Sequence, residues 1–419
     1  MRLRLRDTSA LAAGSAISGL LAYVFFALAT RHLGAADAAA VSVLWTYWSF
    51  AAAVLTFPLQ HWIARTVAAD RHEQAVRAAV PRIALLVVGI GLVSGVVSWL
   101  GRDLLFHRSD LWFPLLVAWV TVGSGFIGVV RGGLAARHRF TGNALVLVAE
   151  NGSRVALGAL LVVLGVQANT GFGAALAAGA LVGLLFPSGY RFDRRPAADS
   201  TQPRRVASPF AFLGGAGGGQ LVGQAILTGG PVVLALAGGT AAEVTALFAG
   251  LALFRAPYTV AIGLVSQITG RLTTLLSTGE FRALARVRAM VLGATALGAL
   301  LAAGVGYWWG PGLVSLIFGE TVVLSPNVSL VVAVGSAVAL GNLVTTVTLL
   351  SQDRAHAVAR AWLVALAGGA AAFGLAGALA PMERTVAAFL VAEVLGLLLL
   401  ALEESRGVAQ ARREREAAR

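Results

Sequence analysis

The sequence predicts an all-α polytopic membrane protein, with about twelve transmembrane helices arranged as two six-helix lobes. The first observation is composition: hydrophobic residues make up 58% of the 419 residues and charged residues only 12%, with a mean hydropathy of +0.81. A soluble domain carries about 25% charged residues. No water-soluble fold could bury so much apolar surface, so a bilayer is the expected solvent. The second observation is that the arginines fall in alternate gaps between apolar stretches.

Each apolar stretch is read as a span because a transmembrane helix needs roughly 20 apolar residues at a rise of about 1.5 Å per residue. The first stretch follows Arg2, Arg4 and Arg6 and is too long for a typical signal peptide, so we expect it to be retained. We place spans at residues 9–30, 38–63, 81–100, 111–131, 143–165, 170–189, 209–236, 242–269, 288–309, 326–350, 359–380 and 385–402.

The distribution of arginine predicts the orientation. All 32 basic residues are arginine, because the chain has no lysine. Of these, 26 lie in the termini and in every second gap, 4 lie in the remaining gaps, and 2, Arg154 and Arg255, lie inside spans. Cytoplasmic loops are enriched in basic residues, so both termini are expected in the cytoplasm and the span count is even. We expect a multi-pass protein of the bacterial inner (plasma) membrane.

A polar linker divides the spans into equal halves. Residues 190–208 contain five arginines and two prolines and cannot bury a core. We therefore predict an N-terminal lobe at 1–189, a C-terminal lobe at 209–403 and a basic cytoplasmic tail at 404–419.

The halves show a weak internal repeat. Short turns at Gly34 and Gly238 join spans one to two and seven to eight, and the helix after each turn carries a proline, Pro58 or Pro257. An even number of spans per half gives both halves the same orientation, so the pseudo-two-fold repeat is parallel, about an axis along the membrane normal. A substrate site is then expected between the lobes, near the middle of the bilayer.

Composition disfavours several function classes. The net charge of +13 could indicate nucleic-acid binding, but the arginines are spread over many segments rather than clustered, so no nucleic-acid partner is expected. There is no cysteine, and the histidines lack the spacing of metal ligands, so no metal site is expected. No sizeable loop carries paired acidic residues for a glycosyltransferase, so we do not expect an enzyme.

Arg255 is the first candidate functional residue, because it lies near the middle of the predicted span 242–269. A charge at the bilayer centre costs at least about 2.5 kcal/mol, and a guanidinium matches the oxygens of a phosphate. The alternative is a structural arginine, paired with Glu393 or bonded to backbone carbonyls that Pro257 leaves without a donor.

Three other polar residues lie together in span five. Glu150 and Arg154 are four residues apart and share one helical face, and Asn151 adjoins them. They form either a neutral packing contact or a site at which H⁺ or Na⁺ binding drives transport. Glu393, in span twelve, is a second candidate for cation coupling or else the partner of Arg255.

The start of span seven is rich in glycine over residues 214–219 and is followed by Gln220 and Gln224. Glycine weakens a helix by about 1 kcal/mol relative to alanine. The run is therefore either a bending point, with both glutamines facing the cavity, or a surface for close helix packing.

Three short motifs resemble those of the polysaccharide-biosynthesis flippases, a family of the multidrug/oligosaccharidyl-lipid/polysaccharide exporter (MOP) superfamily. They are the turn Arg31-His32-Leu33-Gly34, the stretch 130–140 that begins Val130-Arg131-Gly132-Gly133, and the run Leu253-Phe254-Arg255-Ala256-Pro257. The sequence departs from the family where Tyr-Gly often follows the first turn, since Ala39-Ala40 stand there.

The resemblance implies a MATE-like fold of two lobes that works by alternating access, with spans one, two, seven and eight lining the cavity. It implies a polyprenyl-diphosphate-linked oligosaccharide as the substrate, flipped from the cytoplasmic to the outer leaflet, with Arg31 and Arg65 near the cavity mouths. A cation-coupled drug or small-molecule antiporter and a lipid II flippase are the alternatives.

The expected partners follow from the same resemblance. They are the lipid-linked glycan, membrane lipids, and a glycan polymerase or glycosyltransferase acting nearby. We expect a monomer without a cofactor, coupled to H⁺ or Na⁺.

Overall fold

The computed structural model describes residues 2–70, 73–193, 222–261, 280–352 and 354–417. All regular secondary structure in these ranges is helical. The chain divides into two compact units, unit 1 (residues 1–221 and 240–242) and unit 2 (residues 222–239 and 243–419). Each unit is described by itself.

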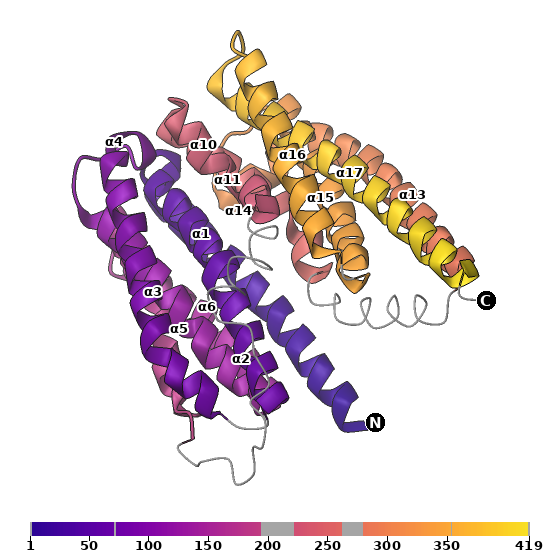
Figure 1. Cartoon of the computed structure of the whole chain (residues 1–419). Coiled ribbons are helices and arrows are strands. Elements are labelled where there is room, and N and C mark those ends of the chain that lie inside the picture. Colours follow the sequence, from indigo (N-terminus) through magenta and orange to yellow (C-terminus); the bar gives the residue numbers. More distant parts are fainter. Residues whose placement is uncertain (1, 71–72, 194–221, 262–279, 353, 418–419) are drawn as a thin grey trace. The chain divides into compact units, whose positions relative to one another are not determined.

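Unit 1 consists of long helices joined by short connections (Figure 1). In chain order they are α1 (Arg2–Ala51), the π-helix η1 (Ala52–Thr56), α2 (Phe57–Asp70), α3 (Gln74–Leu100), α4 (Arg102–Leu105), α5 (Trp112–Ala136), α6 (Phe140–Val163), α7 (Asn169–Ala178), the 3₁₀ helix η2 (Gly179–Leu185) and α8 (Pro187–Tyr190).

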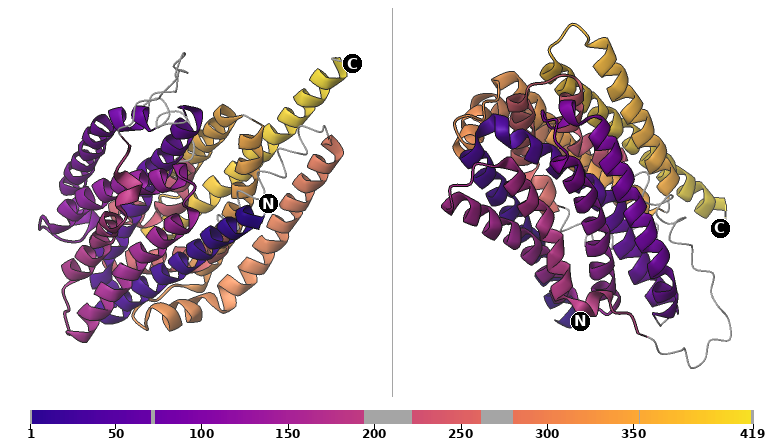
Figure 2. Two further views of the ribbon diagram at one scale, coloured as in Figure 1. Left: turned by 90° about the horizontal axis from the view of Figure 1, so that it is seen from below. Right: turned by 90° about the vertical axis from the view of Figure 1, so that its left-hand side faces the viewer.

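Packing in unit 1 is organised around α5 and α6. Helix α1 packs along α6 (Figure 2), and α2 and α3 both pack on α5. Small residues allow the close approach: a Cβ atom on Gly14 of α1 would lie 2.7 Å from that of Ala144 on α6. Small residues are typical of helix contacts in membranes, where van der Waals packing replaces the hydrophobic effect.

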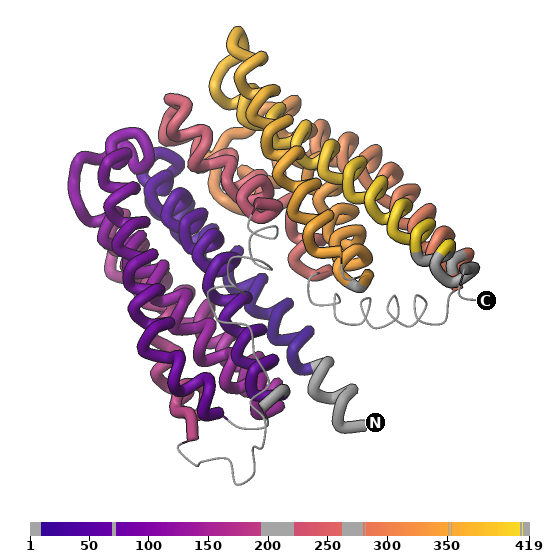
Figure 3. Tube along the Cα trace, in the orientation of Figure 1, coloured from indigo at the N-terminus to yellow at the C-terminus, as the bar shows by residue number. Residues whose placement is uncertain are grey.

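Unit 2 begins with a helix at residues 222–228, and its chain path can be followed in Figure 3. The α15 helix packs against both α13 and α17, and α16 packs along α17. The further helices are α10 (Gly230–Leu236), α11 (Ala241–Phe254), α13 (Phe281–Trp308), α14 (Gly310–Phe318), α15 (Pro326–Ser351), α16 (Ala355–Leu375) and α17 (Pro381–Ala417).

The two turns of the predicted repeat share an unusual backbone conformation. Gly34 has φ 79° and Gly238 has φ 84°, a region that glycine enters without the steric cost other residues pay. Gly34 breaks α1 into the two helices predicted there. Each unit also has an interruption of regular α-helix just before the proline of the repeat. In unit 1 the π-helix η1 ends before Pro58, and in unit 2 the helix is interrupted at Arg255, before Pro257.

Each predicted span has a helical counterpart. Eight segments of the described residues are long and apolar enough to cross a membrane, and the first of them, Ala10–Ala68, contains two predicted spans. Three predicted spans correspond to shorter helices. Span 170–189 corresponds to α7 with η2, and span 209–236 to helix 222–228 with α10. Span 242–269 corresponds to α11 with the residues up to 261. The predicted linker lies outside the described residues beyond Asp193.

Candidate functional site

Arg255 lies at an interruption between α11 and the helical turn that follows, and it joins two helices of unit 2. Its Nε donates to the carbonyl oxygen of Leu251 at 2.8 Å, and its Nη1 donates to that of Leu227 at 3.0 Å. Leu227 lies in helix 222–228, four residues before Pro231. Because proline has no N–H, it cannot supply the bond that this carbonyl would accept in a continuous helix.

Arg255 therefore bonds backbone carbonyls, as in the structural alternative to phosphate binding. That alternative names carbonyls left open by Pro257, whereas the carbonyl that Arg255 bonds on the other helix is left open by Pro231. Unsatisfied backbone groups are costly in a bilayer, so this bond stabilises a break that the membrane would otherwise disfavour.

Glu393 lies on α17 and is fully buried. It interacts electrostatically with Arg255, but its hydrogen-bond donor among the described residues is Asn342 of α15, whose Nδ2 lies 2.7 Å from the Glu393 Oε2. The second carboxylate oxygen of Glu393 and the Oδ1 of Asn342 are both buried without a hydrogen-bond partner. A bound proton or cation would satisfy a buried oxygen of this kind.

Glu150, Asn151 and Arg154 come together on α6 as predicted. Arg154, 1% exposed, donates from Nη2 to Glu150 at 2.7 Å and from Nη1 to the Asn151 side chain at 2.8 Å. The Asn151 Nδ2 donates in turn to Ser18 of α1 at 2.7 Å, and Arg154 Nε donates to the Leu176 carbonyl at 3.0 Å.

Aromatic rings complete this buried group. The Arg154 guanidinium lies 4.4 Å from the ring centre of Trp48 and 5.9 Å from that of Trp45, both on α1. A Cβ atom on Gly179 would lie 2.5 Å from Arg154 Nε, so the start of η2 has no room for a side chain. The group links α1, α6, α7 and η2, which favours the packing interpretation over ion coupling.

Arg131 is a buried charge that the sequence pattern does not single out, because it stands at the end of the predicted span 111–131 and counts among the 26 arginines of the termini and alternate gaps. It lies within α5 and is 8% exposed. Its Nε donates to Oδ1 of Asn143 on α6 at 3.1 Å, and its guanidinium carbon lies 5.6 Å from the ring centre of Phe57 on α2. No carboxylate in the described part of the chain pairs with it, although it interacts electrostatically with Glu150.

The glycines around Arg131 explain its burial. A Cβ atom on Gly128 would lie 2.9 Å from the Cα of Thr56, and one on Gly132 would lie 3.2 Å from the Cα of Gln60. Helix α5 is therefore in close contact with η1 and α2 on either side of Arg131. The signal was present in the sequence as two glycines four residues apart, a spacing typical of close helix contacts in membranes.

The remaining predicted site residues are not gathered at one place within either unit. Arg31 and Arg65 are exposed on α1 and α2. Gln224 is half-buried in helix 222–228, where its carbonyl accepts from the Thr228 hydroxyl at 2.7 Å. Gln220 and the glycine run 214–219 lie outside the described residues.

One end of unit 1 is held by an ion pair between Glu73, just before α3, and Arg137, just after α5. Both oxygens of Glu73 accept from Arg137, at 2.6 and 2.7 Å. Arg137 also donates to the carbonyls of Ser188 and Arg191, and Glu73 accepts from the Asp193 amide. The pair thus fixes the first residues of the predicted linker.

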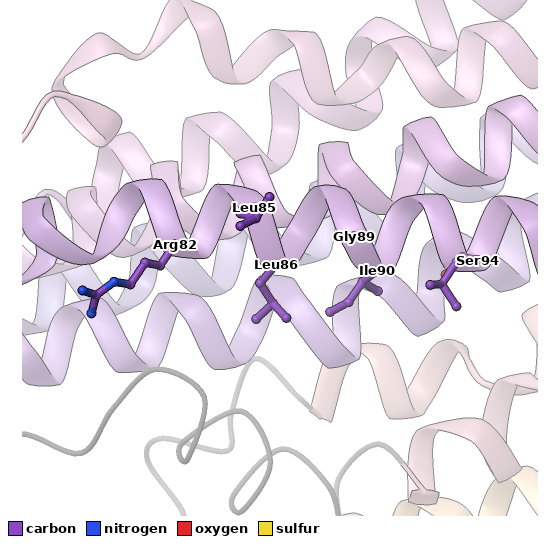
Figure 4. Close-up of a pocket in the computed structure, with 7 residues that line it drawn as sticks. Arg82, Leu85, Leu86, Gly89, Ile90 and Ser94 are labelled. Carbon is purple, nitrogen blue, oxygen red and sulfur yellow. The ribbon is translucent and has the colours of Figure 1, made fainter.

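An open groove of about 590 Å³ runs along one face of α3 (Figure 4). Arg82 lies at one end and Ser94 at the other, and the residues between them are apolar apart from Gly89. Its lining is what a lipid-facing helix presents to acyl chains.

A comparison with known families matches residues 4–276 to the family described as polysaccharide biosynthesis protein. The chain belongs to this family. The match covers more than half of the sequence and includes all three motifs on which the resemblance was based. The resemblance is thereby confirmed. A comparison with curated protein sequences gave no match.

Solved structures with the same fold are MATE transporters and other members of the MOP superfamily. The inward-facing conformation of a multidrug resistance MATE family transporter has a TM-score of 0.68 at 16% identity, covering 93% of this chain and 95% of that chain. The eukaryotic MATE transporter AtDTX14 has a TM-score of 0.63 at 16% identity, covering 98% and 99%.

A third similar structure is a MOP superfamily transporter from Pyrococcus furiosus, described for the reverse polarity of its binding pocket. Its TM-score is 0.60 at 15% identity, covering 96% of each chain. The predicted fold class is confirmed by these likenesses. The family, the fold and the apolar helices together indicate a multi-pass membrane protein.

Proposed function

We propose that this protein is a transporter and that it acts as a flippase. It moves a polyprenyl-diphosphate-linked oligosaccharide from the cytoplasmic to the outer leaflet of the bacterial inner membrane, by alternating access, for the synthesis of cell-surface polysaccharide. Both termini lie in the cytoplasm in this proposal, and glycosyltransferases supply the substrate while a polymerase consumes the product.

The observation that carries the proposal is the sign of the buried charge in unit 1. Its described residues bury two arginines, Arg131 and Arg154, and one carboxylate, Glu150. Glu150 is bonded to Arg154, so one positive charge is left over. The positive charge left over in unit 1 favours an anionic substrate.

A cation-coupled drug antiporter is the second candidate, favoured by the likeness to MATE transporters. A cationic drug needs an accessible carboxylate. The two carboxylates inside the predicted spans, Glu150 and Glu393, are 4% and 0% exposed, so neither is presented to a bulky cation. A lipid II flippase would carry the same type of anionic head group and differs from our proposal only in the glycan.

We propose that the residues divide into three roles. Arg31 and Arg65, both exposed, contact the diphosphate at the mouths of the transport path, and Gln224 contributes a polar contact. Arg255 acts mainly by holding the break beside Pro231. Glu393 with Asn342 is the site of coupling to H⁺ or Na⁺, because its orphaned oxygens can accept either ion.

The direct test uses purified full-length protein in liposomes. A fluorescent polyprenyl-diphosphate sugar placed in both leaflets should become accessible to a membrane-impermeant quencher faster than in protein-free vesicles. Liposomes carrying a cationic dye test the antiporter in parallel. Dye transport without lipid flipping would reject the flippase and support the antiporter.

A further inference from the structure

We propose that Arg131 binds the diphosphate of the lipid-linked substrate, an assignment that rests on the proposed flippase function. The ligand chemistry is that of a phosphate oxyanion attached to a lipid. The site consists of the Arg131 guanidinium, set between Asn143 on α6 and the Phe57 ring on α2.

The first argument is charge. Arg131 is more than nine-tenths buried, and among the described residues no acidic side chain forms an ion pair with it. The nearby carboxylate, Glu150, is engaged by Arg154 at 2.7 Å. A buried charge without a partner is expensive, and a counter-charge that arrives with the substrate would offset this cost only while the substrate is bound.

The second argument is orientation. Arg131 uses Nε to bond Asn143, which holds the guanidinium plane fixed. Among the described residues, neither Nη atom of Arg131 has a hydrogen-bond partner. The two terminal nitrogens are therefore open donors, and a fixed guanidinium fork matches two phosphate oxygens.

The third argument is the side on which the guanidinium is open. His61 lies one helical turn after Phe57 on α2, is exposed, and interacts electrostatically with Arg131. Gly128 and Gly132, which flank Arg131 in the chain, are in close contact with η1 and α2. We place the approach of the anion on the His61 side, because His61 is an exposed residue that interacts with Arg131.

The position also explains part of the family motif. In Val130-Arg131-Gly132-Gly133, the glycines bring α5 against its neighbours: Gly132 meets Gln60 and Ile63, and Gly133 meets the backbone of Gly189. A close contact of this kind places the intervening arginine inside the unit rather than at its surface. The motif thus serves to position a charge as well as to pack helices.

The test measures binding to the full-length protein in detergent. The probes are a polyprenyl diphosphate, the matching polyprenol without phosphate, and phosphatidylglycerol. We expect wild-type protein to prefer the diphosphate over the polyprenol by at least tenfold, and Arg131→Gln to lose that preference. Arg77→Gln is the matched control, because Arg77 is an exposed arginine in the first turn of α3.

A second variant guards against misfolding of Arg131→Gln. Asn143→Asp places a carboxylate where the amide oxygen now accepts from Arg131 Nε. If Arg131 is only structural, this new ion pair leaves lipid binding unchanged. If Arg131 is the phosphate ligand, Asn143→Asp neutralises it and weakens diphosphate binding at least fivefold, with no loss of thermal stability.

Each result decides a separate question. Retained diphosphate preference in folded Arg131→Gln, or in Asn143→Asp, overturns the assignment to Arg131 and leaves the flippase intact. An equal loss of phosphatidylglycerol binding also overturns it, because Arg131 would then be a general lipid head-group contact. Wild-type protein without any diphosphate preference rejects the proposed function itself, and the assignment with it.

Discussion

Arg255 donates a hydrogen bond of 3.0 Å from Nη1 to the carbonyl oxygen of Leu227. That carbonyl is the one that Pro231, four residues later, cannot serve. Each partner lies beside an interruption of regular helix, so the bond connects two breaks in unit 2. The arginine that stands out most clearly in the sequence as a phosphate ligand is thus a link between helices.

We predict that Arg255→Ala destabilises unit 2 and that Pro231→Ala partly rescues it. The alanine variant loses hydrogen bonds from a charged donor, each worth about 1.5–3 kcal/mol. Pro231→Ala restores an amide for the Leu227 carbonyl, so the double variant should recover about 1 kcal/mol of the loss. Thermal unfolding of the four proteins in detergent measures this coupling. Strictly additive effects would show that the two residues act independently.

The local part of the candidate site could be predicted from the sequence. Glu150 and Arg154 pair because four residues separate them on one helix, a relationship that spacing alone reveals. The turns at Gly34 and Gly238 were likewise visible, since glycine before a helical stretch marks a turn. The spans followed from hydropathy, because a bilayer imposes length and composition on every crossing.

The non-local part could not be predicted. Glu393 and Asn342 are 51 residues apart, and their bond depends on how α15 packs on α17. The Leu227 carbonyl is a backbone group that no residue pattern reveals. Hydropathy places a span end only to within a few residues, so it cannot decide whether Arg131 lies in a span or a loop. Its burial depends on the contact that Gly128 and Gly132 allow.

A second prediction concerns the buried pair of α6. Glu150→Gln leaves Arg154 at 1% exposure without its carboxylate, which should cost about 3–5 kcal/mol and sharply reduce the yield of folded protein. Replacing both residues, as Glu150→Gln with Arg154→Met, removes the uncompensated charge and should recover much of the stability. Yield and melting temperature in detergent report both effects. A double variant that folds but fails to respond to an ion gradient would instead support ion coupling at this pair.

A third prediction concerns the pair of Glu73 and Arg137. Its side chains are 11% and 23% exposed, so we expect Arg137→Gln to cost about 1 kcal/mol. The larger effect should be local, because Arg137 also bonds the carbonyls of Ser188 and Arg191. Trypsin should cleave after Arg191 several-fold faster in Arg137→Gln than in wild-type protein. Arg139→Gln, which removes a neighbouring arginine, is the control and should leave the cleavage rate unchanged.

The last prediction concerns ion coupling at Glu393. In liposomes, an imposed gradient of H⁺ or Na⁺ should speed flipping several-fold in wild-type protein and have no effect in Glu393→Gln. The amide of glutamine can still bond Asn342, so the contact between α15 and α17 remains, but it can neither release a proton nor balance a cation. Glu383→Gln removes an exposed carboxylate from the same helix and should keep the full response. If Glu393→Gln responds to the gradient like wild-type protein, Glu393 is not the coupling site. If Glu393→Gln and Glu383→Gln both lose flipping, the cause is general damage to α17.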